Sequence, residues 1–431
     1  MYLVDVMTTL TEQIHDFGRR ARAAARVLAR TSAEQKNRGL LAMADELVSD
    51  APAILAANAQ DLAKAKADGL SAAMLDRLAL DEKRLAKMAD GIREVAALGD
   101  PVGEIIRDWT RPNGLRIQKV RVPIGVVGII YESRPNVTSD AAVLCTKTGN
   151  ATILRGGSES IHSNVAIAAA LSRGGARAGL PADSVLLIPT TDREAVKILC
   201  GMDRWLDVIV PRGGKGLIEA VVSHARMPVI KHYDGICIVY VDKDADLTMA
   251  EAIVLNAKCQ RPGVCNAIET VLVHRAVAKE FFASTGRALL DKGVQLRCDD
   301  AALSIASGLQ AGDKVAPATP EDFRTEFLDL ILAVKIVASL DEAIAHIEEH
   351  GSHHSDGIVT RDAGSGERFL AEVDSATVYW NASTRFTDGG EFGFGAEIGI
   401  STDKLHARGP MGLEELTTYK YVLRGTGQVR G

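Results

Sequence analysis

Short apolar strands that alternate with helical segments between residues 125 and 224 constrain the fold of this 431-residue chain most strongly. The strand-like runs are VVGIIY, ATILRG, SVLLIP and LDVIVP, and the helical segments that follow them are residues 138–149, 159–171, 192–200 and 216–224. Strands that are apolar throughout are buried on both faces, which requires a parallel sheet covered by helices on both sides. Thr138 or Ser139 is the expected N-cap of the first of these helices.

A second alternation of the same kind runs from Ile236 to Val378. Its strand-like runs are ICIVYV, IETVLV, LILAVKIV, DGIVT and ATVYW. Residues 8–97 precede both alternations and carry apolar side chains at helical spacing, which predicts a series of helices. The sequence therefore predicts an α/β fold with two domains.

A β-hairpin is predicted between the helices and the first strand. The runs IIRDWT and LRIQKVRV flank the dipeptide Asn113-Gly114, which is the strongest short-range hairpin signal. An isolated two-stranded hairpin is only marginally stable in water. We therefore expect this ribbon to pack on another chain, or alternatively on its own domain.

Composition and charge exclude several classes of protein. Apolar residues make up 47% and charged residues 25%, as in ordinary soluble proteins, and the net charge of −6 gives no basic field for nucleic acid. No apolar run approaches the roughly 18–20 residues of a membrane span, and the first residues lack the pattern of a signal peptide. The six cysteines show no CxxC spacing, which favours reduced thiols in a cytoplasmic protein.

The run NAKCQRPGVCNAIE at residues 256–269 is the strongest candidate for chemistry. The tripeptide RPG interrupts a helical pattern, and Cys265 follows this break just before a predicted strand. A thiol on such a turn is accessible, and the charge of Arg261 favours thiolate, so that Cys265 is a candidate nucleophile. The alternative is a structural cysteine that fills a gap. Cys259, at the end of the helical pattern, fits that structural role better.

Polar or glycine-rich turns at residues 132–136, 155–159 and 212–216 follow strands of the first predicted sheet. Ligands of open α/β sheets bind beyond the carboxyl ends of the strands. The turn at 212–216 reads RGGKG and opens a helix, so its backbone N–H groups and two cations favour an anion such as phosphate. It is neither a GxGxxG fingerprint nor a Walker A loop, and a simple tight turn is the alternative.

The order of these motifs resembles that of the aldehyde dehydrogenase superfamily over nearly the whole chain. The segments that carry the resemblance are VPIGVVGIIYESRPNVTSDAA, KTGNATILRGGSES, AGLPADSVLLIP, VIVPRGGKGLIE, NAKCQRPGVCNAIET, EFLDLILAVKIV and FGFGAEIGIST. SRPNVTSD and QRPGVCN are most similar to the branch that reduces L-glutamyl 5-phosphate to L-glutamate 5-semialdehyde in proline biosynthesis. The resemblance implies two Rossmann-like α/β domains with open parallel sheets, plus a small oligomerisation ribbon.

The same resemblance implies roles for individual residues. Cys265 takes the place of the nucleophile, and Asn136 takes the place of the side-chain donor to the oxyanion. His232 or Tyr233 stands where hydrolytic members carry a glutamate that activates water. Without that base, the thioester on Cys265 should be released to phosphate and not to water.

The substrate carries a phosphate and an α-carboxylate, which arginines bind well. Arg134 and Arg261 flank the two catalytic turns and are the candidates for this contact, with structural ion pairs as the alternative. His232 is a candidate proton donor or phosphate ligand, and a hydrogen-bonded structural histidine is an equal alternative.

The resemblance also implies a nicotinamide cofactor. Arg155 stands where most members have a lysine beside the adenine ribose, and Ser158 stands where NAD-preferring members have a carboxylate. A serine and a nearby arginine accept a 2′-phosphate that a carboxylate would repel, which predicts NADPH/NADP. Glu326 takes the place of the glutamate that holds the nicotinamide ribose. Further cofactor contacts are expected from the glycine-rich turn, at Arg212, Gly213, Gly214 and Lys215.

The implied domain organisation is an NADP(H)-binding domain (residues 1–104 and 123–233), a catalytic domain (234–405) and an oligomerisation segment (105–122 and 412–431). By the same analogy, residues 412–424 should form a helix and a strand beside the ribbon and help to build a homodimer or homotetramer. The chain has no kinase half, so a separate glutamate 5-kinase would supply the substrate.

The sequence also allows other interpretations. His350, His353 and His354 cluster in the segment GSHHSDG, but the expected chemistry needs no metal and none is predicted. The chain could reduce another acyl phosphate or an acyl-CoA, or it could bind a cofactor without catalysis. The absence of a P-loop disfavours a kinase.

Overall fold

The computed structural model describes residues 9–132 and 134–430, except for the side chain of Ala73. By its internal contacts the chain divides into two compact units. The first unit runs to Lys231 and also includes Gly393–Gly399 and the chain from Met411 onward, and the second comprises His232–Phe392 and Ile400–Pro410. Residues 393–399, which fall within the expected catalytic range 234–405, therefore belong with the first unit.

Two expectations from the sequence fall wholly or partly on residues that the structure does not describe. These are the absence of a signal peptide, which concerns residues 1–8, and the position of Ser133 in the turn at 132–136. In the described part of the chain, no helix is long and apolar enough to cross a lipid bilayer.

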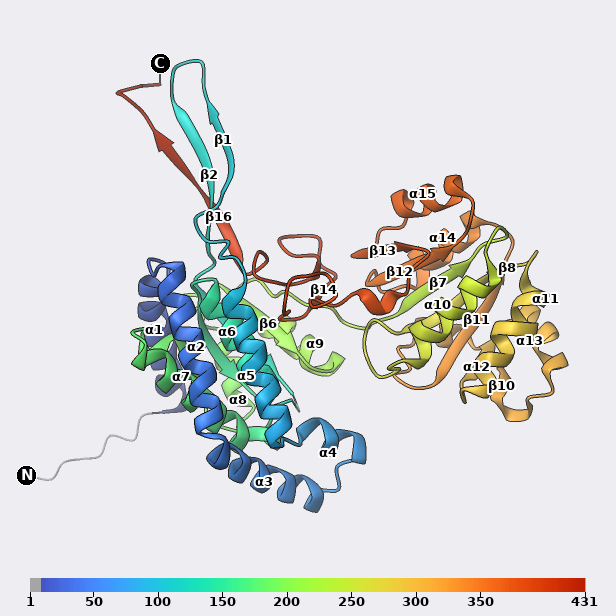
Figure 1. Cartoon of the computed structure of the whole chain (residues 1–431), viewed down its shortest axis with the longest axis horizontal. Helices are drawn as coiled ribbons and strands as arrows, with labels where there is room; N and C mark the ends of the chain where they lie inside the picture. Colours follow the sequence, from blue (N-terminus) through green and yellow to red (C-terminus); the bar gives the residue numbers. More distant parts are fainter. Residues whose placement is uncertain (1–8, 133, 431) are drawn as a thin grey trace, which may run out of the picture. The chain divides into compact units, whose positions relative to one another are not determined.

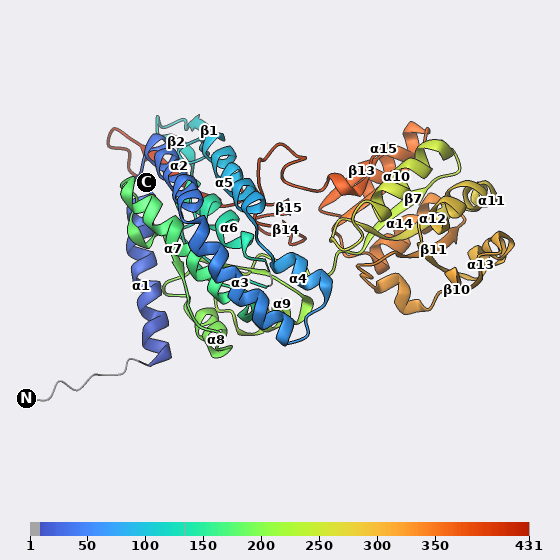
Figure 2. The same cartoon turned by 60° about the horizontal axis from the view of Figure 1, so that its bottom comes forward.

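Helices α1–α5 open the first unit, as the helical spacing of residues 8–97 predicts. Serine, threonine or aspartate side chains accept a backbone N–H group at the N-termini of α1, α2, α4 and α5. Figure 2 shows α2 beside α7, with which it makes extensive contact. The helices are α1 (Leu10–Leu28), α2 (Ala33–Ser49), α3 (Ala51–Ala67), α4 (Ala72–Leu78), α5 (Glu82–Ala97), α6 (Asn136–Lys147), α7 (Ile161–Arg177), α8 (Glu194–Cys200) and α9 (Lys215–His224).

The sheet of the first unit is parallel and has the strand order β5-β4-β3-β6, which confirms the first predicted alternation. The strands are β3 (Val126–Tyr131), β4 (Ala151–Arg155), β5 (Val185–Leu187) and β6 (Val208–Arg212). Arg155 pairs with Ile130 of the central strand, and Arg212 pairs with Tyr131. The turns at 132–136, 155–159 and 212–216 therefore leave neighbouring strands at the same edge of the sheet.

The predicted N-cap of α6 is wrong, because the helix begins at Asn136 and contains both Thr138 and Ser139. The Thr138 hydroxyl is buried, where it lies 2.7 Å from the Tyr131 hydroxyl and donates to the Asn164 amide oxygen at 3.1 Å. Ser139 donates to the Asn136 carbonyl oxygen at 2.8 Å. These partners satisfy both hydroxyls inside the helix, so neither has to serve as a cap.

The predicted hairpin is confirmed, and a third strand joins it. β1 (Ile105–Thr110) and β2 (Arg116–Pro123) pair antiparallel around a turn in which Gly114 has a φ of +84°. β16 (Thr417–Arg424) pairs antiparallel with the other edge of β2. Figure 1 shows this three-stranded ribbon extending away from the helices of the first unit.

The helix expected within residues 412–424 is wrong, although the strand is confirmed. Residues 413–416 form a turn. Just before them Met411 exchanges backbone hydrogen bonds with the segment 398–399, and just after them β16 begins at Thr417. The segment between Met411 and Thr417 is too short to nucleate a helix.

The sheet of the second unit is also parallel, with the order β10-β9-β11-β8-β7-β12-β13, which confirms the second predicted alternation. Its strands are β7 (Cys237–Val241), β8 (Ile268–His274), β9 (Gln295–Cys298), β10 (Val315–Pro317), β11 (Ile331–Val337), β12 (Ser355–Val359) and β13 (Thr377–Trp380). Its α-helices are α10 (Leu247–Cys259), α11 (Ala278–Phe281), α12 (Arg287–Asp291), α13 (Asp300–Ala306), α14 (Leu340–His350) and α15 (Ala363–Glu372). A small pair of strands, β14 (Ile400–Ser401) and β15 (Gly409–Pro410), completes the unit.

Both faces of this second sheet are buried, as the apolar strands require. Successive side chains of β7 alternate between two hydrophobic clusters. Cys237 and Val239 belong to the cluster that includes residues of α10–α13, whereas Ile238 and Tyr240 belong to the cluster that includes residues of α14 and α15.

Candidate active site

The turn that carries Cys265 lies between α10 and β8, where the sequence places it. α10 ends at Cys259 and β8 begins at Ile268, and the Cys265 residue between them is half-buried. Gly235 packs directly on this turn, because a Cβ atom at Gly235 would lie 2.3 Å from the Cys265 carbonyl oxygen. The close approach therefore requires glycine at position 235.

Hydrogen bonds on both sides fix the backbone of this turn. The Cys237 thiol donates to the Cys265 carbonyl oxygen at 3.2 Å, and burial raises the pKa of Cys237 well above its ordinary value. The Asn266 side chain donates to the Thr387 carbonyl oxygen at 2.8 Å, and the Thr384 hydroxyl donates to the Asn266 carbonyl oxygen at 2.7 Å. A neutral thiol and the segment 384–387 thus hold Cys265 in place.

Cys259 lies in a different environment from Cys265. It packs against the hydrophobic cluster of α10–α13, and burial raises the pKa of its thiol. A thiol that contacts a core and resists ionisation is a poor nucleophile. The structural role that the sequence favours for Cys259 agrees with this position.

His232 lies beside a buried histidine. The rings of His232 and His354 meet edge to face with centroids 5.6 Å apart. His354 is fully buried, and its Nδ1 lies 2.8 Å from the Ser355 hydroxyl. Burial, and then the neighbouring His232, lower the pKa of His354 to about 3, so its imidazole is neutral at physiological pH.

The histidines of the GSHHSDG segment point to different partners. His353 Nδ1 lies 2.9 Å from the Asp374 carbonyl oxygen, whereas His350 ends α14 and contacts the ring of His346. Across residues 9–132 and 134–430, no group of three or more histidine, cysteine, aspartate or glutamate side chains has the arrangement of a metal site.

Glu326 lies close to the Cys265 turn in the second unit. Burial raises the pKa of Glu326, and a hydrogen bond from the Gly235 backbone N–H acts in the opposite direction. The Lys258 charge also lies close enough to stabilise the ionised carboxylate. Gly235 therefore contacts both the turn of the candidate nucleophile and the predicted cofactor residue.

A buried ion pair supports the loop that carries Glu326. Lys258 Nζ lies 2.5 Å from Glu269 Oε2, and neither side chain is exposed to solvent. The other carboxylate oxygen of Glu269 accepts the backbone N–H of Leu328 at 3.3 Å, at a residue whose φ is +55°. Burial raises the pKa of Glu269 to about 7, against the opposing effect of Lys258. Sequence reasoning missed this pair, because Lys258 and Glu269 each resemble an ordinary charged residue within an apolar segment.

In the first unit, the glycine-rich turn already holds an anionic oxygen. The Gly214 N–H, at the N-cap of α9, donates to Glu132 Oε2 at 2.9 Å. A Cβ atom at Gly213 would lie 2.4 Å from the same oxygen. The turn thus binds a carboxylate where a phosphate is expected, and it needs bare glycine backbone to do so.

Arg155 and Ser158 lie on the same turn but in different surroundings. The Arg155 side chain is 8% exposed and donates to the carbonyl oxygens of Gly156 (3.1 Å) and Thr191 (3.2 Å). Burial lowers the pKa of Arg155. Its guanidinium therefore supports the turn through backbone carbonyl groups.

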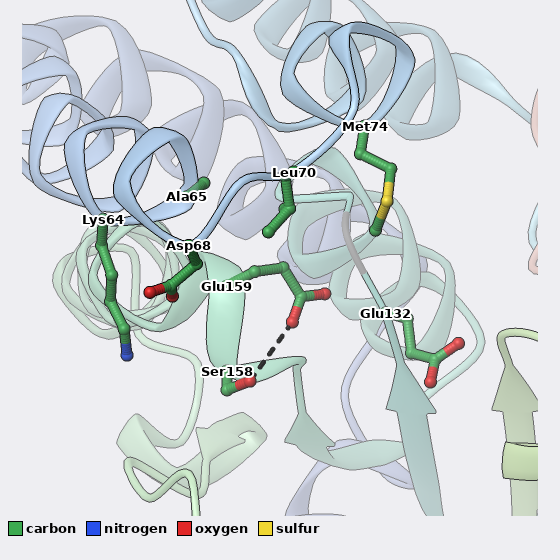
Figure 3. Close-up of a pocket in the computed structure, with 8 residues that line it drawn as sticks. All are labelled: Lys64, Ala65, Asp68, Leu70, Met74, Glu132, Ser158 and Glu159. Atoms are coloured by element: carbon green, nitrogen blue, oxygen red, sulfur yellow. Dashed lines mark hydrogen bonds between the residues drawn. The ribbon is translucent and has the colours of Figure 1, made fainter.

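Ser158 lines a pocket of about 340 Å³ at the end of β4. Figure 3 shows its hydroxyl beside the Glu159 carboxylate, to which it donates at 3.5 Å, with the Lys64 side chain of α3 reaching toward the same side. The pocket is lined by Lys64, Ala65, Asp68, Leu70, Met74, Glu132, Ser158 and Glu159. Sequence reasoning missed Lys64, because the helix that supplies it is remote in sequence, whereas Glu159 lies in the predicted turn at 155–159.

Asn136 and Arg134 flank the start of α6. The Asn136 amide nitrogen donates to Asp140 Oδ2 at 2.9 Å, one helical turn away. Burial raises the pKa of Asp140, and the Asn136 hydrogen bond opposes that rise. Arg134 is exposed.

The predicted residues thus form two groups. The second unit gathers Cys265, Arg261, His232 and Glu326 around the turn before β8, whereas the first unit gathers Asn136, Arg134, Arg155, Ser158 and residues 212–215 at the carboxyl ends of its strands. A half-buried cysteine on a turn of the second unit and glycine-rich strand ends in the first unit are the features that the candidate site rests on.

The sequence profile of the aldehyde dehydrogenase family matches residues 2–301. The chain therefore belongs to the aldehyde dehydrogenase family.

Relatives and a solved structure narrow this assignment. The chain is 57% identical to a protein of Moorella thermoacetica, over 97% of this chain and 99% of that protein, and 56% identical to one of Carboxydothermus hydrogenoformans, over 97% and 100%. Both are named gamma-glutamyl phosphate reductase. The crystal structure of gamma-glutamyl phosphate reductase from Thermotoga maritima is 45% identical, with a TM-score of 0.94 over 97% of this chain and 100% of that one. Within the family, the chain groups with proteins of this name.

Proposed function

We propose that this protein reduces L-glutamyl 5-phosphate to L-glutamate 5-semialdehyde with release of phosphate, a step of L-proline biosynthesis. The observation that carries the proposal is the Cys265 turn, a thiol-bearing turn between α10 and β8 in a chain that is 57% identical to a gamma-glutamyl phosphate reductase. An alternative within the family is another acyl-phosphate or acyl-CoA reductase, and the assay described below separates them.

In the proposed mechanism, the Cys265 sulfur attacks the acyl carbon and the bond from that carbon to the phosphate oxygen breaks. The product on the enzyme is a thioester, and phosphate leaves with the electron pair. Backbone N–H groups near Cys265 and the Asn136 amide are the proposed donors to the oxyanion. Because Asn136 donates to Asp140 in the structure, this role requires its amide to turn toward the substrate.

The absence of a water-activating glutamate at position 232 or 233 supports release of the thioester to phosphate in the reverse direction. His232 and Tyr233 occupy the stretch before Gly235 that packs on the Cys265 turn. His232 is the proposed proton donor or phosphate ligand of this stretch, and Arg134 and Arg261 are the proposed arginines for the substrate anions.

We propose NADPH as the cofactor, which supplies a hydride when bound. The α9 N-terminus supports a phosphate contact, because Gly214 already binds a carboxylate oxygen there, and Glu132 must give up this bond first. Ser158 and Lys64 at the pocket support the 2′-phosphate, together with the nearby charge of Arg155, whereas Glu159 opposes it. Arg212, Gly213 and Lys215 complete the proposed phosphate contacts, and Glu326 is the proposed partner of the nicotinamide ribose.

We also propose a domain assignment, a location and partners. Residues 1–104 and 123–233 bind the cofactor, 234–405 carry the nucleophile, and 105–122 with 412–431 join subunits into a homodimer or homotetramer. The protein works in the cytoplasm, and a separate glutamate 5-kinase supplies the acyl phosphate.

A steady-state assay in the oxidative direction tests this function. Glutamate 5-semialdehyde is offered with NADP or NAD, each with and without phosphate or arsenate. We expect activity with NADP that requires phosphate or arsenate. Phosphate-independent formation of glutamate contradicts the proposal, as does a requirement for coenzyme A, and a preference for NAD contradicts the cofactor choice.

A further inference from the structure

Arg385 is joined to the Cys265 turn through its own backbone segment. It lies in the short helix η7 (Thr384–Phe386), more than a hundred residues from Cys265 in sequence. The Asn266 side chain donates to the Thr387 carbonyl oxygen, and Thr384 donates back to the Asn266 carbonyl oxygen. These two bonds flank Arg385, so its position is fixed relative to the residue that follows Cys265.

The Arg385 side chain is oriented by a second contact near the same turn. Its Nε donates to Gln260 Oε1 at 2.9 Å, and Gln260 is the C-cap residue of α10. Arg261 follows directly and is exposed. Gln260 therefore directs the guanidinium of Arg385 toward the stretch that leads to Cys265.

Two guanidinium groups thus lie close together near the thiol. Burial, and next the repulsion from Arg261, lower the pKa of Arg385, while Cys265 and Asp388 act in the opposite direction. The Asp388 carboxylate oxygen Oδ1 accepts a hydrogen bond from the backbone N–H of Gly390 at 2.9 Å. Among the residues that the structure describes, neither Arg261 nor Arg385 has a salt-bridge partner within 4.0 Å. Like charges that gather without a salt-bridged carboxylate favour an anionic ligand.

We infer that Arg385, together with Arg261, forms the site that receives the phosphoryl group of the substrate beside Cys265. This inference rests on the proposed function and adds a residue to it. Gln260 acts as a positioning residue, because it holds the Arg385 guanidinium without contacting the substrate itself.

The chemistry of the substrate favours its phosphate over its α-carboxylate as the ligand here. In the acyl phosphate, a single oxygen separates phosphorus from the carbonyl carbon that the thiol attacks. Three carbon atoms separate that carbonyl carbon from the α-carboxylate. The arginines are joined to the nucleophile's own turn, so they are near the group that leaves, and two guanidinium groups match the charge of a phosphate dianion.

The experiment measures the Michaelis constants in the oxidative direction, with glutamate 5-semialdehyde, NADP and phosphate varied in turn. We expect Arg385→Gln to raise the KM for phosphate by roughly 10- to 100-fold, as expected for loss of a charged hydrogen bond. The KM for NADP should stay within about twofold of the unaltered protein, because the proposed phosphate contacts of the cofactor lie in the first unit and Arg385 is not one of the proposed cofactor residues. Arg385→Lys should give a smaller rise, since it keeps the charge but loses the planar donors.

Two further variants complete the test. Gln260→Leu removes the contact that orients Arg385. It should therefore also raise the KM for phosphate, but by a smaller factor than Arg385→Gln. This variant provides the test if Arg385→Gln does not fold. Arg361→Gln is the control, since Arg361 is 71% exposed on the same unit and pairs with Asp246. It should leave all three constants unchanged.

Three other outcomes would contradict either this inference or the proposed function. An unchanged KM for phosphate in Arg385→Gln overturns the inference while the proposed function stands. A rise confined to the KM for the semialdehyde also overturns it, because it assigns Arg385 to the α-carboxylate. An unaltered protein that needs no phosphate contradicts the proposed function itself and removes the phosphoryl site with it.

Discussion

At the scale of single residues, Cys259 and Cys265 are close in sequence but lie in different surroundings. Cys259 packs on the hydrophobic cluster of α10–α13, whereas Cys265 lies on a turn whose carbonyl oxygen is bound by Cys237. The Cys237 thiol stays protonated because burial raises its pKa, so it can donate that bond. The difference between the two sites makes a direct comparison of variants informative.

We predict that Cys265→Ser lowers kcat by at least about a thousandfold, because a serine hydroxyl is a far weaker nucleophile than a thiolate. Binding of NADPH, measured by fluorescence titration, should be unchanged. Cys259→Ser serves as the matched variant and should keep most of the activity. The nucleophile assignment is wrong if the two variants show the reverse pattern.

The position of the candidate nucleophile could be predicted from local sequence, because a helix, an RPG break and a strand follow one another in QRPGVCN. Arg385 could not, since more than a hundred residues separate it from Cys265 and hydrogen bonds of Asn266 and Gln260 bring the two segments together. The same limit applies to Glu132, which binds Gly214 from a different strand end. Contacts between distant segments leave no local pattern to detect.

At the scale of elements, α14 carries a buried titratable group on its packing face. His346 is 6% exposed, and its ring centroid lies 5.3 Å from that of Phe323 and 4.3 Å from that of His350. Burial, then the charges of His350, Lys335 and Arg324, lower the pKa of His346 from 6.5 to about 3. The folded protein therefore keeps this ring neutral in acid, whereas the unfolded chain takes up a proton near pH 6.5.

This difference predicts a loss of stability as the pH falls from 6.5 toward 3. Between pH 7 and pH 5, His346 alone should remove about 2 kcal/mol from the free energy of unfolding. His346→Phe fits the same aromatic surroundings and cannot be protonated, so its loss over this range should be smaller by about that amount. Urea unfolding at both pH values measures the effect, and equal losses in the two proteins would disprove it.

The strands and the start of α6 show which elements the hydrophobic pattern of the sequence can predict. Strands that are buried on both faces, such as β3 and β7, read as continuous apolar runs and were predicted. β9 and β10 were missed, because β9 contains Gln295 and Arg297 and β10 has only three residues, including a proline that an edge strand tolerates. The start of α6 was missed because buried partners, and not a cap, satisfy Thr138 and Ser139.

At the scale of the whole molecule, the ribbon exposes apolar side chains that a monomer does not need to expose. Ile105 is 51% exposed, and Tyr421 and Leu423 are each 55% exposed. β1 and β16 are the edges of this sheet, so each also leaves one side of its backbone without a strand partner within the described chain. A second copy of the same ribbon would cover such a surface, which supports the proposed homo-oligomer.

We predict that Leu423→Glu weakens self-association by at least about tenfold, because it places a charge where an apolar side chain would be buried. Light scattering at several concentrations should then show a mass closer to the 45.9 kDa of one chain. Val27→Glu is the control, since Val27 is 47% exposed and belongs to α1 and not to the ribbon strands. Association that is insensitive to Leu423→Glu, or a monomeric unaltered protein, would contradict the proposal.

The ribbon also has a consequence for how the molecule is made. Its middle strand, β2, is synthesised before the entire second unit, but its partner β16 follows that unit in the sequence. On the ribosome, β2 must therefore wait with one edge exposed while more than 290 residues of chain emerge. The unit that is translated first is thus the last to be completed, and chaperones that bind nascent chains have the longest access to β2.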